Sequence, residues 1–202
     1  MDKRKWLALM ARIGLDHNIS TYHVLLSHYQ HKARYYHNAN HINAVLAHLA
    51  KVESLANDYD AIELALWFHD AIYKVFSATN ELDSANFAAS FLTKNGANKA
   101  LTSKVHALIM ATEHNAIPRM NDEQLIVDID LSILGCAPEI YALFELWVRK
   151  EYRLVPNFIY RKKRKAILTG FLDRERIYCH QYFYQQLETS ARTNIYHAIK
   201  QL

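Results

Sequence analysis

The sequence predicts an all-α protein, a compact bundle of about ten helices folded as one domain over residues 1–202. Apolar residues recur every three or four positions along most of the chain, which is the helical period. Only 4 Gly and 3 Pro occur in 202 residues, so few positions suit the hairpin turns of a sandwich or barrel. An apolar fraction of 51% with 22% charged residues is ordinary for a globular chain and excludes a disordered protein.

Capping residues and turn formers mark the ends of the expected helices. Ser20 and Thr79 stand where N-caps belong, Gly96 where a C-cap belongs, and Pro138 at a first helical position. No stretch has the composition of a linker, and no repeat occurs at a solenoid period. The helices expected in chain order are 4–13, 20–33, 39–56, 59–71, 80–94, 98–113, 122–134, 138–153, 161–173 and 182–200.

Composition also limits the classes of function. The net charge of +4 is small for a nucleic-acid binder, so nucleic acid is not expected as a partner, whereas a small anionic substrate is compatible. No apolar run reaches the length of about 18 residues that spans a bilayer, and the first residues lack a signal-peptide pattern. We therefore expect a cytoplasmic protein without a membrane partner, with a homodimer allowed. Cys136 and Cys179 form no CxxC pair, so a metal would be held by nitrogen and oxygen atoms.

The segment 65–73 places an adjacent His69-Asp70 pair inside a run that is apolar on both sides. A buried imidazole beside a buried carboxylate is costly unless each finds a partner, and a divalent cation satisfies both. The simpler alternative is a core histidine bonded to backbone, with Asp70 ending its helix. Further ligands are needed to decide between the two.

Two other segments offer such ligands. His37 and His41 are four residues apart and share a helical face if the helix starts early enough; a bend near Asn38 would separate them, and His41 alone could be a surface or N-cap residue. Asp128 and Asp130 lie in an apolar helix and point about 200° apart, so only one can face a given site. We expect Asp130 to be that one.

In their order along the chain, these residues resemble the HD-domain superfamily of metal-dependent phosphohydrolases, and specifically a bacterial branch of about this length. The resemblance extends over nearly the whole chain and rests on several longer phrases. The phrases are Arg34-x-Tyr36-His37-Asn38-x-x-His41-Ile42, Trp67-Phe68-His69-Asp70-x-x-Tyr73, Asn80-Glu81-x-x-Ser84-Ala85, Ala111-Thr112-x-His114, Asp130-Leu131-Ser132-Ile133-Leu134-Gly135, Arg149-x-Glu151-Tyr152 and Ala191-Arg192-x-Asn194.

The resemblance implies a divalent cation held by His41, His69, Asp70 and Asp130, and hydrolysis of a phosphate ester of a small molecule, with nucleotides among the candidates. Two imidazoles and two carboxylates suit Mn²⁺, Fe²⁺, Co²⁺, Ni²⁺ or Zn²⁺ better than Mg²⁺, as one ion or two. Four protein ligands leave about two octahedral positions open, for water and for a phosphate oxygen.

Three carboxylates are candidates for proton transfer. Asp70 could use its second oxygen to orient the reacting water, and Asp128 could accept a proton nearby. Glu81 is a candidate acid or base, although a carboxylate after the N-cap Thr79 could simply stabilise the helix N-terminus.

Three cationic side chains are candidate substrate contacts. Arg34 and His37 flank the first ligand and could neutralise a phosphate, for which the fixed donors of arginine are suited. His114 could bind phosphate, add a ligand for a second metal, or have neither role. The run 161–165 contains five consecutive basic residues, typical of a solvated helix start, with phosphate or nucleic-acid contact as the alternative.

Two other functions remain open beside the enzyme. One is a non-catalytic HD-fold protein that binds metal and nucleotide as a sensor or docking module. The other is a helical nucleic-acid binder using the 161–165 run, with affinity that falls steeply as salt rises. The presence of all four ligands favours the enzyme.

Overall fold

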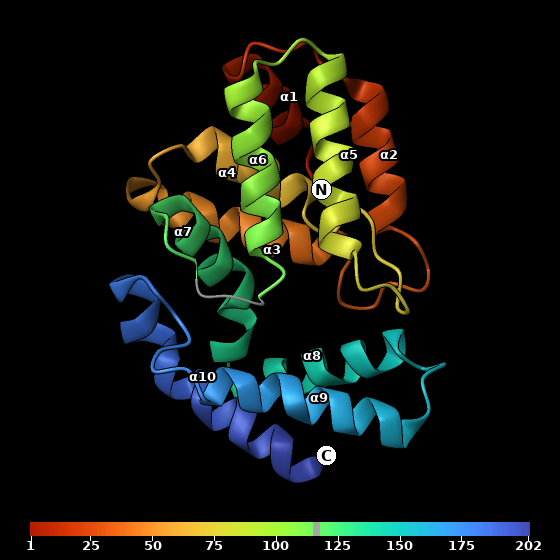
Figure 1. Ribbon diagram of the computed structural model, residues 1–202, viewed down its shortest axis with the longest axis vertical. Helices are drawn as coiled ribbons and strands as arrows, with labels where there is room; N and C mark the ends of the chain where they lie inside the picture. Colours follow the sequence, from red (N-terminus) through yellow and green to blue (C-terminus); the bar gives the residue numbers. More distant parts are fainter. Residues whose placement is uncertain (115–117) are drawn as a thin grey trace. The chain divides into compact units, whose positions relative to one another are not determined.

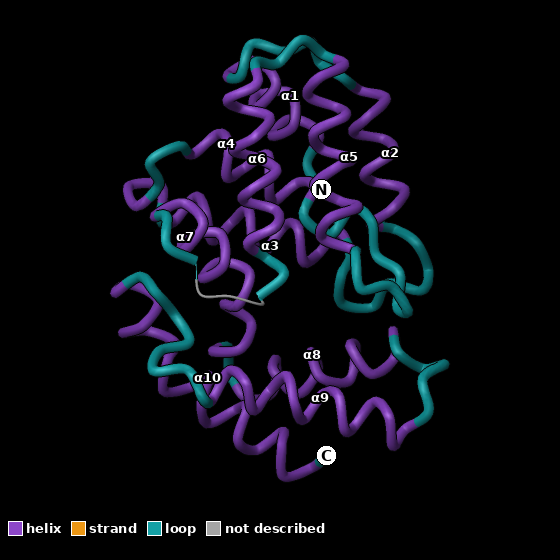
Figure 2. Tube along the Cα trace, viewed as in Figure 1, coloured by secondary structure: helices purple, strands orange, loops and turns teal. Residues whose placement is uncertain are grey.

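The computed structural model describes residues 1–114 and 118–202, and every regular element in these two ranges is helical (Figure 1, Figure 2). This confirms the predicted all-α fold of about ten helices. The α-helices are α1 (Lys3–Arg12), α2 (Ile19–Tyr29), α3 (Ala39–Lys51), α4 (Tyr59–Phe68), α5 (Asn80–Lys94), α6 (Lys99–Ala111), α7 (Asn121–Asp130), α8 (Pro138–Glu151), α9 (Asn157–Leu172) and α10 (Gln181–Gln201).

Short 3₁₀ segments account for two differences from the expected boundaries. The helix expected over 39–56 ends at Lys51 and is followed by a 3₁₀ turn at Glu53–Leu55. The helix expected over 122–134 ends at Asp130 and continues as η2 (Leu131–Gly135). Hydrophobic periodicity does not distinguish a tightened last turn from an α-helix, because the same residues face the core in both.

The chain forms two compact units, Met1–Val127 and Asp128–Leu202, and the division falls inside α7. In the first unit α4 is the central element, with every residue from Ala61 to Phe68 buried. Trp6 of α1 packs edge-on against Trp67, with ring centroids 5.4 Å apart, and Phe68 stacks on Phe91 of α5 at the same distance. From Ala61 to Phe68 the helix is buried on all sides, which explains why these residues are apolar except for Glu63, whose carboxylate pairs with Arg12.

In the second unit α10 packs against η2 and α9. The buried Glu188 of α10 accepts hydrogen bonds from the backbone N–H groups of Ile177 and Tyr178 and pairs with Arg192 at 2.7 Å. Asn194 donates to the carbonyls of Leu134 and, through the same amide, of Cys136. These side chains fix the loop before α10 and the end of η2 through backbone groups that would otherwise be buried without partners.

Within the two described ranges no single helix has the length and apolarity to cross a membrane. By length and composition alone, one pair of helices bent by 104°, Asn121–Gly135 with Pro138–Glu151, passes the same test.

Candidate metal centre

Two buried imidazoles meet in the first unit. His41 lies on the first turn of α3, which begins after the N-cap Asn38, and His69 directly follows α4 as its C-cap. Their Nε2 atoms are 3.1 Å apart, and the two residues are only 6% and 2% exposed. Ring nitrogens at this distance need a proton or a cation between them, because two lone pairs would repel each other.

The orientation of His69 is fixed by its other nitrogen. Nδ1 lies 3.0 Å from the carbonyl oxygen of Leu66. A carbonyl can only accept, so we assign the proton of the neutral ring to Nδ1, which leaves the Nε2 lone pair directed at His41. This is the arrangement found in histidines that ligate metals through Nε2.

Asp70 completes a triangle of donor atoms. Its Oδ2 is 3.2 Å from Nε2 of His69 and 3.5 Å from Nε2 of His41. Ligands bonded at about 2.1 Å to one ion, in adjacent octahedral positions, are separated by about 3.0 Å. The three atoms therefore fit adjacent positions around a single divalent cation.

The charge state of Asp70 also suits a cation. Burial by itself would raise the pKa of this carboxyl, yet the imidazoles of His69, His37 and His41 outweigh burial and hold the pKa well below its usual range. The carboxylate is therefore ionised at neutral pH, which is the form that binds metal.

Asp130, the fourth ligand expected from the sequence, ends α7 and belongs to the second unit, and its role as a ligand stays a prediction. Imidazole and carboxylate are the donor types expected from the sequence, and they do not identify one metal.

The guanidinium of Arg34 is directed at the backbone around the site. It donates to the carbonyl oxygens of Asp70 at 2.6 Å, Ala71 at 2.9 Å and His37 at 3.2 Å, and lies against the ring of Tyr73 at 5.6 Å. Three of its donor contacts thus tie the segment before α3 to the segment after α4. The substrate contact expected for Arg34 stays a prediction, and the structure shows a positioning role that the sequence did not indicate.

Two residues of α2 that sequence reasoning missed complete this arrangement. Nδ1 of His28 lies 3.0 Å from the carbonyl oxygen of Ala71, and the hydroxyl of Tyr29 donates to the carbonyl of Trp67 at 3.1 Å. The carbonyl groups at the end of a helix lack intrahelical partners, and these side chains supply them. Only the helical period of α2 is visible in the sequence, and that period does not reveal contacts to a distant backbone.

His37 and Glu81 both lie near Asp70. The His37 ring stacks on Tyr73, with centroids 4.2 Å apart, and its charge acts on Asp70. Burial raises the pKa of Glu81, the charges of Asp70 and Glu113 raise it further, and His114 lowers it. His37 and Glu81 thus interact electrostatically with Asp70, and His114 interacts with Glu81; their catalytic and substrate roles stay predictions.

Asp128 has a structural use in the second unit. It is fully buried, and its two carboxylate oxygens accept the backbone N–H groups of Cys179 at 2.9 Å and His180 at 2.7 Å. Burial raises the pKa of Asp128 to about 6, although the two N–H donors act in the opposite direction. Its expected role as a proton acceptor stays a prediction.

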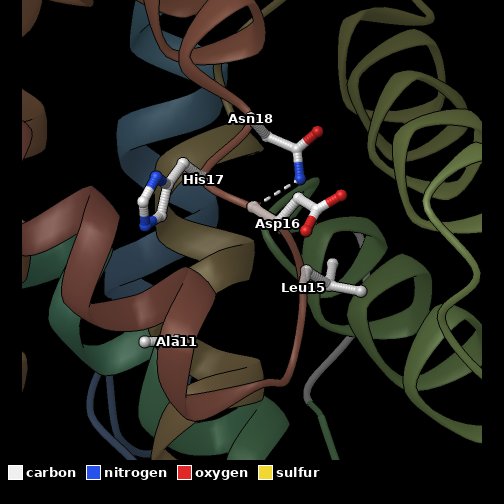
Figure 3. A pocket seen from close by; sticks show the side chains of 5 residues that line it. All are labelled: Ala11, Leu15, Asp16, His17 and Asn18. Carbon is white, nitrogen blue, oxygen red and sulfur yellow. Dashed lines mark hydrogen bonds between the residues drawn. The ribbon is translucent and has the colours of Figure 1, made fainter.

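A separate hollow of about 430 Å³ lies at the loop between α1 and α2, lined by Ala11 and residues 15–18 (Figure 3). There the side-chain amide of Asn18 donates to the backbone carbonyl of Asp16 at 2.6 Å. None of the residues predicted for the metal or substrate lines this hollow.

Fold and site together define a class: an all-helical protein with a buried histidine and aspartate group that could hold a metal ion. No protein-family model, curated protein or solved structure matches the chain.

Proposed function

We propose that this protein is a divalent-metal-dependent phosphohydrolase that cleaves a phosphate ester of a small molecule, with nucleotides among the candidate substrates. The observation that carries the proposal is the triangle of His41 Nε2, His69 Nε2 and Asp70 Oδ2, with sides of 3.1, 3.2 and 3.5 Å. The resemblance of the sequence to HD-domain phosphohydrolases supports the same reading.

Asp130 is the proposed fourth ligand. With Asp70 it brings two negative charges, which balance a divalent cation, while the two imidazoles remain neutral. The absence of thiolate and the presence of imidazole favour Mn²⁺, Fe²⁺, Co²⁺, Ni²⁺ or Zn²⁺ over Mg²⁺. When bound, such a cation lowers the pKa of a water molecule and polarises a phosphate oxygen.

The chain's own residues divide the remaining work. Asp70 uses the oxygen that does not ligate to accept a hydrogen bond from the attacking water and orient it. His37 and His114 compensate the charge of the phosphate. Glu81, whose pKa is raised by burial, is suited to supply a proton to the departing oxygen.

The test is metal analysis of the purified protein, followed by a screen of phosphate monoesters, nucleotides and cyclic nucleotides with Mn²⁺, Co²⁺, Ni²⁺, Zn²⁺ and Mg²⁺. Asp70→Asn and His69→Gln should lower metal affinity by about tenfold or more, since loss of a residue that only orients a ligand already costs about 10–100-fold. Hydrolysis should fall further, and the helical circular-dichroism signal should not change.

Matched controls use the same substitutions away from the site. Asp16→Asn and His17→Gln change exposed side chains in the α1–α2 loop and should leave metal content and turnover at the wild-type level. Wild-type turnover in Asp70→Asn would refute the proposed mechanism. Tight metal and nucleotide binding without hydrolysis of any ester would instead support a sensor.

A further inference from the structure

Two large apolar side chains project from the segment that joins α8 to α9. Leu154 is 73% exposed and Phe158 is 75% exposed, and only Phe76 is as exposed among the large apolar side chains of the described ranges. Both residues belong to the second unit and are four positions apart. Exposing this much apolar surface is unfavourable in water and commonly marks an interaction site.

The backbone of this segment is held in place. The guanidinium of Arg149 donates to the carbonyl of Tyr152 at 2.6 Å and to that of Val155 at 3.2 Å, and lies 4.7 Å from the ring centroid of Tyr160. Leu154 lies between the two carbonyls that Arg149 binds. The exposure of Leu154 therefore belongs to an ordered turn, and does not result from a loose one.

Positive charge surrounds these apolar side chains. Residues 150–165 contain seven basic residues and one acidic residue, Glu151, which is buried. Arg164 is neutralised by Glu145 at 2.6 Å. The exposed basic residues are Lys150, Arg153, Arg161, Lys162, Lys163 and Lys165.

The spacing on α9 combines both features on one face. Phe158, Lys162 and Lys165 stand at positions i, i+4 and i+7 of the helix, which lie above one another on its surface. The buried side chains Tyr160 and Phe171 lie on the opposite side of the helix. An aromatic ring near the start of α9 is thus followed along the same face by lysines.

We propose that the α8–α9 turn binds the surface of an anionic lipid bilayer, with Leu154 and Phe158 entering the boundary of the acyl chains and the surrounding lysines and arginines contacting the headgroups. Apolar residues flanked by cations are the combination that interfacial membrane binding requires. The sequence-based expectation of no membrane partner rested on the lack of a spanning segment, and interfacial binding needs none.

Two other occupants fit these observations less well. A nucleic-acid backbone would attract the cations, but it gives an aliphatic residue such as Leu154 nothing to contact. A second copy of the chain meeting this surface in a twofold interface would place two sets of six exposed cations against each other.

The assay is co-sedimentation with vesicles of phosphatidylcholine alone or with about 30% phosphatidylserine. The wild type should bind the anionic vesicles, bind neutral vesicles at least tenfold more weakly, and lose affinity as NaCl rises. Lys162→Gln and Lys165→Gln should each weaken binding about fivefold, equivalent to about 1 kcal/mol per charge. Leu154→Ser with Phe158→Ser should reduce it at least tenfold, whereas Phe158→Trp should preserve it, because tryptophan is also favoured at the interface.

Phe76→Ser is the matched apolar control, since Phe76 is 75% exposed in the first unit; Lys94→Gln with Lys99→Gln is the charge control, on exposed lysines. Both controls should bind vesicles like the wild type, and all variants should keep the helical signal. Absence of wild-type binding, equal binding to neutral vesicles, or no effect of Leu154→Ser with Phe158→Ser would overturn the proposal. Binding to an oligonucleotide or concentration-dependent dimerisation, without vesicle binding, would assign the surface to those partners instead.

Discussion

Replacing Arg34 by lysine separates its observed positioning role from the expected substrate contact. In the structure three carbonyl oxygens, those of His37, Asp70 and Ala71, accept hydrogen bonds from the guanidinium. A lysine ammonium at the end of a flexible chain can replace about one of these bonds, because it lacks the planar fork of donors. Two carbonyls next to the site would then lose a charged partner.

The loss can be estimated from the bond count. A hydrogen bond to a charged group contributes about 1.5–3 kcal/mol, and the lower value applies because Arg34 is only half-buried. Two lost bonds correspond to about 3 kcal/mol. At about 2–4 °C per kcal/mol for a chain of this length, Arg34→Lys should lower the melting temperature by about 6–12 °C.

The same variant should also bind metal more weakly, by about 10–100-fold, because the backbone of His37 and Asp70 is no longer tied together. Thermal unfolding followed by circular dichroism in the presence of a chelator measures the first effect, and chelator competition for Zn²⁺ or Mn²⁺ measures the second. Arg4→Lys is the control, since the Arg4 side chain is 91% exposed, and it should melt within about 1 °C of the wild type.

A different result would refute the positioning role of Arg34. If Arg34→Lys melts like the wild type and binds metal with the same affinity, while KM for a phosphate ester rises, the guanidinium acts on the substrate as the sequence suggested. A fall in stability together with metal affinity, at unchanged KM, supports the contacts seen in the structure.

Two further predictions concern the second unit. Burial raises the pKa of Asp128 to about 6 in the folded protein, above the ordinary value of 3.8. The folded protein therefore holds more protons than the unfolded chain between these pH values, and the free energy of unfolding should fall as pH rises through them. The whole effect on the free energy of unfolding is about 3 kcal/mol, of which about 2 kcal/mol should be lost between pH 4.5 and 7.5. Urea unfolding of the wild type should show this loss, and urea unfolding of Asp128→Asn should not. Equal pH dependence of the two proteins would contradict the prediction. Gly135→Ala would place a Cβ 2.6 Å from that of Leu187, and it should lower the free energy of unfolding by about 1–3 kcal/mol in the same measurement. The control Gly170→Ala lies at an exposed helical position with open space around it, and it should leave that free energy unchanged or raise it by up to about 1 kcal/mol. Equal effects of the two substitutions would show that the contact between Gly135 and Leu187 is not tight.

The helices could be predicted because their signal is local. Apolar period, capping residues and the scarcity of glycine and proline lie within one segment, and the structure follows them to within a few residues at most boundaries. The start of α9 is an exception: the helix begins at Asn157, after Pro156, and not at the basic run. The expected start was placed at the charged residues 161–165, four residues too late, although a proline close to a helix start, here the N-cap Pro156, is itself a helix-start signal.

The candidate site could be predicted where polar residues interrupt an apolar segment of the sequence. His69 and Asp70 follow the most buried helix, and His41 lies three residues after an N-cap. Each of these polar residues therefore stands out in the sequence because its neighbours are mostly apolar. What Asp128 and Arg34 contact was not visible, because their partners are backbone groups. Every residue carries such groups, and no side-chain pattern in the sequence indicates which of them a distant Asp or Arg will bind.

The phrases that carried the family resemblance include structural residues as well as candidate ligands. Asn80 accepts the backbone N–H of Lys74 and donates to its carbonyl, and Ser84 exchanges the same two bonds with Ile72. These contacts fix the segment that follows Asp70 against the start of α5. A phrase such as Asn80-Glu81-x-x-Ser84 can therefore characterise the fold around a metal centre without contributing a ligand to it.

The charges at the end of α4 favour a cation over a phosphate anion. The carbonyl end of a helix carries partial negative charge, and here the ionised Asp70 follows it directly. Arg34 offsets part of that charge from the backbone side, where three carbonyls already engage it. A phosphate approaching the imidazoles of His41 and His69 would meet a carboxylate and a helix C-terminus, both of which repel it. Under the proposed function, a divalent ion held by the two imidazoles and Asp70 would reverse the sign of the field that a phosphate meets, so phosphate binding should require the metal.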